Sequence, residues 1–207
     1  ERDMARALVT GAVDEYQRRA HLGQGRALHN PAEMIDRVLK IPSSLVPKAL
    51  LEEYGIHQQF HSHADSHIGT YAEVERFLQE TSKEYTNLCL DTGHFAYYLG
   101  DNVKLMNAYP DRIGYLHLKQ VEPDILAEAL KNDMPFVDAV AKGVMTEPGF
   151  NGVPDFAPII EKAAEIDPDM FAIVEQDMYG CSVDFPFPIA KRTRDHIHSC
   201  THAARFQ

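Results

Sequence analysis

The sequence predicts an α/β fold, and we expect its particular form to be a (β/α)8 TIM barrel. Apolar runs of strand length alternate with amphipathic stretches from residue 55 onward, and each run ends in a histidine or carboxylate side chain that could bind a metal ion. Such alternation implies right-handed crossovers and a parallel sheet. Only four strands are convincing, whereas a complete barrel has eight in about 250 residues. We therefore expect an incomplete barrel whose N-terminal strands are missing.

The composition is that of an ordinary globular protein. The 207 residues are 44% hydrophobic and 25% charged, which is enough to bury a core. The formal charge of −11 argues against nucleic acid and against a membrane as partners. We find no long apolar run and no secretory signal. The three cysteines are far apart and odd in number, so we expect a cytoplasmic protein in a reducing compartment.

We expect two regions: a helical or irregular segment over residues 1–54, and the C-terminal part of the barrel over residues 55–207. In the first region, helices are expected over residues 2–20, from the N-cap Asn30 with Pro31, and from Ser43 or Ser44 to Gly55. The chain begins with Glu1 instead of Met, which is consistent with a piece of a longer protein.

From residue 55 the pattern changes to strands followed by helices. Strands are expected over residues 56–62, 85–91, 113–119 and 171–177. Helices are expected over residues 70–80, 101–109, 123–130, 136–142, 155–166 and 188–203. The segment Asp91-Thr-Gly-His94 predicts a turn, and the Gly- and Pro-rich segment 146–154 predicts a loop near the site.

The segment Gly55–His67 is rich in histidine. If residues 56–62 are extended, alternate side chains share one face of the strand, and these are His57, Gln59, His61 and His63. An edge strand with a wet, histidine-rich side explains this pattern equally well when the segment is considered alone. We expect Asp65 and His67 to lie beyond the strand and to shape the loop.

Each of the four predicted strands ends in a residue suited to bind a divalent metal. These residues are His61 or His63, then Asp91, His117 and Glu175. Imidazoles and carboxylates are ligands for Mn, Fe, Co or Zn, and the strand ends of a parallel barrel surround one mouth. Taken singly, each also has a structural explanation: Asp91 could cap a turn, His117 could be a core histidine, and Glu175 could be an ion-pair partner.

Three further side chains are candidates for catalysis. His63 would contact the substrate or act as an acid or base. His94 follows Asp91 by three residues and could do the same, although a solvated loop histidine is the alternative. Lys119 shares the face of His117 and could stabilise a developing enolate or oxyanion, unless it reaches solvent from the strand end.

Three other residues are weaker candidates. Asp177 shares the face of Glu175 by period two. Glu147 lies in the Gly- and Pro-rich loop, where most carboxylates are merely solvated. Cys89 is in phase with Asp91, and we expect it to pack in the core because no partnered base is near it in sequence.

Several motifs resemble those of the xylose-isomerase-like barrel family. They are Asp91-Thr-Gly-His94, Tyr115-Leu-His-Leu-Lys119, Ile173-Val-Glu-Gln-Asp177, the downstream Pro186-Phe-Pro-Ile-Ala, and the histidine-rich segment. The resemblance covers about residues 55 to 200 and is closest to the inosose dehydratase branch, whose first strand-end motif is also rich in histidine. Sugar epimerases of this family usually have Glu at that position and an Arg a few residues after His117, and this chain has neither.

The resemblance implies a divalent metal ion, Mn, Co, Mg or Zn, bound by Asp91, His117, Glu175 and a histidine. That histidine is His61 by alignment of the motif, or His63 by its position nearest the mouth. The implied reaction is a metal-dependent removal of water from a cyclic polyol ketone by α-proton abstraction and β-elimination, as in inosose dehydratase. Two alternatives share these ligands or motifs: a keto-sugar isomerase or epimerase, and a noncatalytic barrel or partner subunit.

The predicted partner is a small neutral polyol or keto-sugar. A phosphorylated sugar needs a clamp of Arg, Lys or a Gly-rich turn, and the sequence shows no such cluster near the strand ends. Half a barrel leaves open sheet edges that need a partner or a swapped copy, so we also expect a homo-oligomer.

Overall fold

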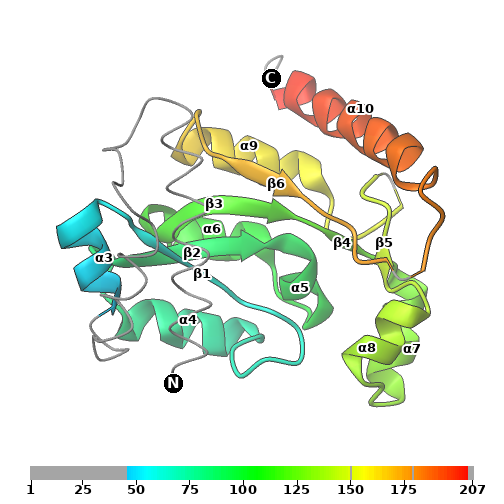
Figure 1. Cartoon of the computed structure of the whole chain (residues 1–207), viewed down its shortest axis with the longest axis horizontal. Helices are drawn as coiled ribbons and strands as arrows, with labels where there is room; N and C mark the ends of the chain where they lie inside the picture. Colours follow the sequence, from blue (N-terminus) through cyan, green and yellow to red (C-terminus); the bar gives the residue numbers. More distant parts are fainter. Residues whose placement is uncertain (1–45, 150, 179, 205–207) are drawn as a thin grey trace. The chain divides into compact units, whose positions relative to one another are not determined.

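The structure, a computed structural model, describes residues 46–149, 151–178 and 180–204 (Figure 1). The helices predicted before residue 46 lie outside these residues. The described strands form one sheet with the order β1-β2-β3-β6 and a small second sheet, β4-β5. The chain divides into two compact units, which are considered separately: residues 1–60 with 82–87, and residues 61–81 with 88–207.

The described part of the first unit contains helix α3, Val46–Tyr54, which confirms the helix predicted to end at Gly55. Gly55 has φ +67°, a left-handed conformation that Gly adopts without a steric penalty. Its N–H donates to the Leu51 carbonyl at 2.9 Å, and the Ile56 N–H donates to the Leu50 carbonyl at 3.1 Å. These bonds satisfy the last carbonyls of the helix. The predicted boundary between residues 54 and 55 stays a prediction.

Three strands of the larger sheet are parallel, as predicted: β2, Thr86–Asp91; β3, Ile113–Leu118; and β6, Ala172–Val174. The register pairs Asp91 with His117 and His117 with Ile173, so the carboxyl ends of these strands meet at one edge. Strand β1, Gln58–His61, is shorter than predicted and ends at His61. His63 therefore lies beyond the strand, and the prediction that it shares the strand face of His61 by period two is wrong.

Apart from α5, where a turn was predicted, the helices of the second unit follow the predicted ranges closely. They are α4, Tyr71–Glu80; α5, Thr92–Tyr97; α6, Asn102–Ala108; α7, Pro123–Lys131; α8, Phe136–Ala141; α9, Phe156–Ile166; and α10, Pro186–Ala204, with a 3-10 turn, η2, at Pro110–Arg112. In Figure 1, α6 and α9 lie on the same side of β3 and β6, and α10 lies beside α9. None of the described helices is long and apolar enough to cross a membrane.

The prediction of a turn over Asp91-Thr-Gly-His94 is wrong, because β2 passes directly into helix α5. Asp91 is the N-cap, and its Oδ1 atom accepts a hydrogen bond from the His94 N–H at 2.8 Å. Gly93 is required by space: a Cβ atom there would lie 2.5 Å from the Lys119 Cβ. The glycine that resembled a turn residue therefore permits close packing of α5 on the end of β3.

The predicted loop after residue 145 begins with a short strand. Strand β5, Met145–Thr146, pairs antiparallel with β4, Gln120–Val121, and two-residue strands carry no periodicity from which to predict them. Gln120 holds the rest of the loop, since its side chain donates to the Pro154 carbonyl and accepts from the Gly149 N–H. This second sheet packs with α5, α7 and α8 in one hydrophobic cluster.

Candidate metal centre and active site

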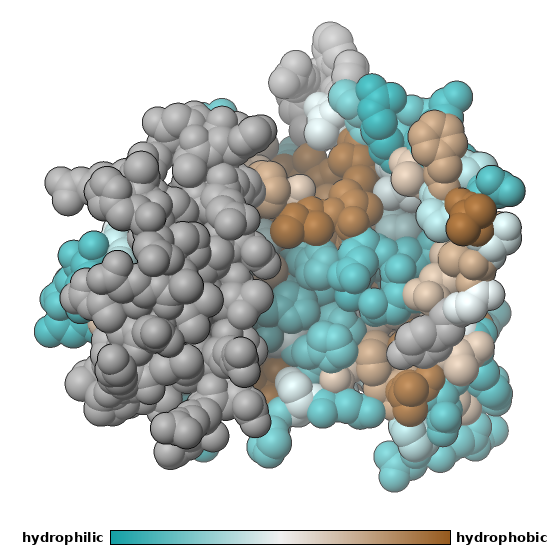
Figure 2. Space-filling view, in the orientation of Figure 1, coloured by the Kyte–Doolittle hydropathy of each residue, from teal (hydrophilic) through white to brown (hydrophobic). Residues whose placement is uncertain are grey.

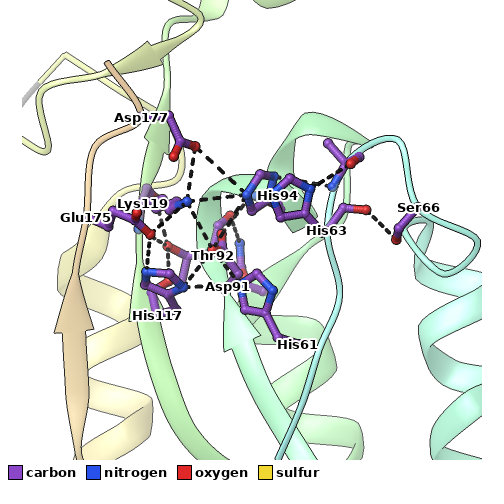
Figure 3. Close-up of polar contacts among 12 residues, drawn as sticks. His61, His63, Ser66, Asp91, Thr92, His94, His117, Lys119, Glu175 and Asp177 are labelled. Atoms are coloured by element: carbon purple, nitrogen blue, oxygen red, sulfur yellow. Dashed lines mark hydrogen bonds and ion pairs between the residues drawn. The ribbon is translucent and has the colours of Figure 1, made fainter. Parts of the chain in front are cut away.

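Three ligand atoms from three strand ends form a nearly equilateral triangle (Figure 3). His61 Nε2 lies 3.0 Å from Asp91 Oδ2 and 3.1 Å from His117 Nδ1, and the last two atoms are 3.1 Å apart. Metal–ligand bonds of about 2.1 Å at right angles place neighbouring ligand atoms about 3 Å apart. The triangle therefore has the spacing of one face of an octahedral metal site.

Glu175, the fourth predicted ligand, approaches the opposite edge of the His117 ring. Its Oε2 atom lies 2.8 Å from His117 Nε2 and 3.0 Å from Lys119 Nζ. The contact with His117 lacks hydrogen-bond geometry, and the buried Nε2 atom has no hydrogen-bond partner among the described residues. The structure thus brings Glu175 to the site but outside the triangle. An unpartnered ring nitrogen beside a carboxylate is a donor set that fits a metal ion.

Asp91 is fully buried and remains ionised. Burial by itself raises the pKa of its carboxyl group, but hydrogen bonds from His117 and His61 more than reverse this effect, so the pKa lies well below its usual range. Its two oxygens have separate roles, because Oδ1 caps helix α5 and Oδ2 faces the two histidines. The structural explanation and the metal-ligand prediction for Asp91 are therefore compatible.

Lys119 is buried, with 3% of its surface exposed, so the alternative that it reaches solvent is wrong. Its Nζ atom lies 3.0 Å from both Glu175 Oε2 and Asp177 Oδ2, and 4.0 Å from Asp91 Oδ2. Burial by itself lowers the pKa of Lys119, but these carboxylates raise it by a larger amount, so the net shift of the pKa is upward. Three carboxylates around one ammonium leave an excess of two negative charges, which a divalent cation would neutralise.

His94 is also buried, so the alternative of a solvated loop histidine is wrong. Burial lowers its pKa to about 3, and the ring is therefore neutral. The exposed His63 ring stacks on it, with 3.6 Å between ring centroids and 36° between ring planes. The structure thus places His63 beside the site although it lies beyond the strand.

Cys89 is buried in β2, as predicted, and it also lies near the candidate metal ligands. Its Sγ atom and ligand nitrogens of His61 and His117 lie within 4.8 Å of one another. Burial raises the pKa of Cys89 to about 12, and a protonated thiol is a poor metal ligand. Its phase with Asp91, two residues on, is the sequence signal for this proximity.

Thr92 is a positioning residue that the sequence did not indicate, because its side chain suits neither metal binding nor proton transfer. Its buried Oγ1 atom donates to the Lys119 carbonyl at 2.7 Å and accepts from the Lys119 N–H at 3.0 Å.

Glu147, a weaker candidate, makes a bidentate ion pair with Arg192, at 2.6 and 2.7 Å. Asp65 shapes its loop as predicted, since it accepts a hydrogen bond from the Phe136 N–H.

A cavity of about 410 Å³ opens between β6 and α10, beside Glu175. Figure 2 shows apolar surface gathered in this region, and the apolar walls include Val174, Ile189 and Ile197. Glu175, Gln176, Thr193 and Arg194 also line the cavity, so polar groups lie among its apolar walls.

The fold and the site together define a class of protein: a parallel α/β chain with imidazole and carboxylate side chains gathered at the strand ends. The family model described as "Xylose isomerase-like TIM barrel" matches residues 1–200, and the chain belongs to this family. The family resemblance deduced from the motifs is thereby confirmed.

Two curated relatives are similar in sequence to this chain. The chain is 35% identical over 153 residues to an inosose dehydratase of Geobacillus kaustophilus, covering 74% of this chain and 49% of the relative. It is 33% identical over 157 residues to the rhizopine catabolism protein MocC of Rhizobium meliloti, covering 76% and 47%. The chain thus spans about half the length of the curated relatives it matches.

Two solved structures have a similar fold at 16% identity. An L-ribulose 3-epimerase gives a TM-score of 0.55 and covers 87% of this chain and 59% of its own. The IolI protein, crystallised with a bound zinc atom, gives a TM-score of 0.51 and covers 78% and 58%. At this identity the likeness concerns the fold alone.

Proposed function

We propose that the protein is a metal-dependent lyase that removes water from a cyclic polyol ketone, as the name of its inosose dehydratase relatives indicates for them. The observation that carries this proposal is the triangle of His61, Asp91 and His117 beside the buried Lys119 and His94. It combines a ligand set with groups able to move protons. Of the two candidate histidines, His61 is the ligand in this proposal because its Nε2 atom lies in the triangle.

The metal would be held by His61, Asp91 and His117, and Glu175 would become the fourth ligand by turning away from the Nε2 edge of the His117 ring, where it lies in this structure. Mixed imidazole and carboxylate donors suit Mn, Co or Zn better than Mg, which prefers oxygen ligands. When bound, such an ion supplies a Lewis acid that polarises the substrate carbonyl and thereby acidifies the neighbouring C–H group.

The three proposed catalytic residues surround this ligand set. His63 is exposed at the mouth and would accept the α-proton of the substrate. The Lys119 ammonium group would stabilise negative charge that develops on a substrate oxygen, and it is held in place by Glu175 and Asp177. His94, whose Nε2 atom lies 3.4 Å from Lys119 Nζ, would contact a substrate hydroxyl group (Figure 3).

The charge of the site favours an uncharged substrate. Lys119, the buried lysine of the described site, is already paired with Glu175 and Asp177, so its ammonium group is not free to clamp a phosphate group. An inosose or a 3-keto sugar fits this condition. The homo-oligomeric state and the cytoplasmic location stay predictions.

The test combines metal analysis with a spectroscopic assay. Metal bound to the purified protein is measured, and the protein is incubated with scyllo-inosose and Mn or Co, because elimination produces a conjugated dicarbonyl that absorbs in the ultraviolet. Asp91→Asn and Glu175→Gln should lose metal and activity. Asp101→Asn is the matched control, because Asn can replace Asp as the N-cap of α6.

Three results would count against the proposal. Full metal occupancy and activity in both site variants would mean that the site is wrong. Conversion of the ketone to an isomer without new absorbance would favour an isomerase or epimerase. Metal binding without turnover of any neutral keto-polyol would favour the noncatalytic alternative.

A further inference from the structure

The backbone of Ala64 contacts the Nδ1 atoms of both histidine rings, one through its carbonyl oxygen and the other through its N–H. Its carbonyl oxygen lies 2.7 Å from His63 Nδ1, and its N–H donates to His94 Nδ1 at 3.3 Å. A carbonyl oxygen can only accept a hydrogen bond and an amide N–H can only donate one. His63 must therefore carry a proton on Nδ1, whereas His94 must have a lone pair there and its proton on Nε2.

We propose that the backbone N–H and carbonyl of Ala64 hold His63 and His94 in opposite tautomers, so that His63 offers a lone pair at Nε2 and His94 offers an N–H. This assignment deepens the proposed function and rests on it for its chemical meaning. It divides the two histidines by role, with His63 as the proton acceptor and His94 as a hydrogen-bond donor to the substrate. Sequence pattern alone cannot make this distinction, since both residues are histidines beside the same strand ends.

With its proton on Nε2, His94 forms no hydrogen bond with Lys119 although the two nitrogens are close. His94 Nε2 and Lys119 Nζ are 3.4 Å apart, and both carry hydrogens, so neither can accept a bond from the other. Lys119 already donates toward Glu175 and Asp177. The remaining Lys119 hydrogen and the His94 N–H form a pair of donors for one substrate oxygen.

This donor pair fits the oxygen that leaves during dehydration. His63 takes the α-proton, the electron pair of the broken C–H bond forms the C=C bond, and the C–O bond breaks with its electrons on oxygen. Lys119 gives that oxygen a proton while His94 donates a hydrogen bond to it, and the oxygen departs as water. One proton is taken up and one is released, so the step balances without another reactant.

Asp65 is the positioning residue for this arrangement. Its carboxylate accepts a hydrogen bond from the Phe136 N–H at 2.9 Å, and its own N–H donates to the Tyr98 hydroxyl at 3.0 Å. The Phe136 ring packs edge-on to His63, with 5.6 Å between ring centroids. Asp65 adopts the left-handed conformation, at φ 56°, which Asp and Asn tolerate better than most residues. These bonds fix the turn that directs the Ala64 carbonyl toward His63 Nδ1 and the Ala64 N–H toward His94 Nδ1.

Nitrogen-15 NMR of the full chain with labelled histidine reads the tautomers directly, without substrate. His63→Gln and His94→Gln assign the two sets of ring signals, and Zn²⁺ serves as a diamagnetic ion if one is needed. We expect the proton on Nδ1 in His63 and on Nε2 in His94. Either ring in the other tautomer would overturn the proposal. The expected tautomers without any dehydration would retain this inference and refute the proposed function.

Variants of Asp65 test the positioning role. Asp65→Ala should lose the tautomer preference of His63 and lower kcat by roughly 10- to 100-fold with little change in KM. Asp65→Asn should keep both, because its side-chain oxygen can still accept the Phe136 N–H. Asp133→Ala is the matched control, since Asp133 is also left-handed, at φ 47°. Unchanged tautomers in Asp65→Ala would exclude Asp65 as the positioning residue.

Discussion

Replacing Gly93 with Ala should disturb the site without touching any predicted ligand. The added methyl group would lie 2.5 Å from the Lys119 Cβ, 3.0 Å from the Lys119 carbonyl carbon and 3.2 Å from the Gln120 nitrogen. Carbon atoms make favourable contacts at about 3.5–4.0 Å, so the nearest one is about 1 Å too close. Two of the three neighbours are backbone atoms, and they cannot move aside as the end of a side chain can.

The expected cost follows from these contacts. Forcing a methyl group into a packed interior costs about 1–3 kcal/mol, which exceeds the helix propensity that Ala gains over Gly, at most about 1 kcal/mol. For a chain of this size, each kcal/mol lowers Tm by about 2–4 °C. Because the methyl group pushes on the end of β3, which carries His117 and Lys119, metal affinity should also fall by roughly 10- to 100-fold.

Thermal unfolding and metal titration of Gly93→Ala measure both effects. Gly149→Ala is the matched control, because its added Cβ would have its nearest neighbour at 3.7 Å, an ordinary contact. We expect Gly149→Ala to behave like the wild type in both measurements. If Gly93→Ala also retains the wild-type Tm and metal affinity, the close approach of α5 to Lys119 is not what requires glycine at this position.

Three further predictions concern stability and binding. Thr92→Val should weaken metal binding and lower the unfolding free energy by about 1–3 kcal/mol, because the buried Lys119 N–H and carbonyl lose their hydrogen-bond partner. Thr92→Ser should restore both metal affinity and stability. Equal behaviour of the two variants in metal titration and urea unfolding would contradict this role. Thr70→Ala removes the capping box of α4 and should cost about 0.5–2 kcal/mol in urea unfolding without changing metal affinity, and a change in affinity would be unexpected. Asp91 has a lowered pKa in the folded state, so its stabilising contribution is present above the unfolded value of about 4 and is lost as pH falls below it. Metal-free wild type should therefore lose more stability than Asp91→Asn between about pH 6 and about pH 3, and equal losses in urea unfolding would contradict the assignment.

The local features of the chain could be read from the sequence because they depend on neighbouring residues. Apolar runs predicted β2 and β3, and the pattern of N-caps and prolines predicted most helices of the second unit. Candidate metal ligands could be named because imidazoles and carboxylates occur at the predicted strand ends. Parallel pairing then explains why Asp91 and His117, far apart in sequence, lie opposite each other.

Tertiary structure decided what depends on distances between side chains. Only the packed chain shows that His61, Asp91 and His117 form a triangle while Glu175 approaches the other nitrogen of His117. Gly93 resembled a turn residue because the sequence does not show that Lys119 packs against it. The tautomers of His63 and His94 depend on the backbone N–H and carbonyl of Ala64, which contact one ring each. The residue types were thus determined by the sequence, whereas their roles depend on ring orientation and burial, which only the folded chain fixes.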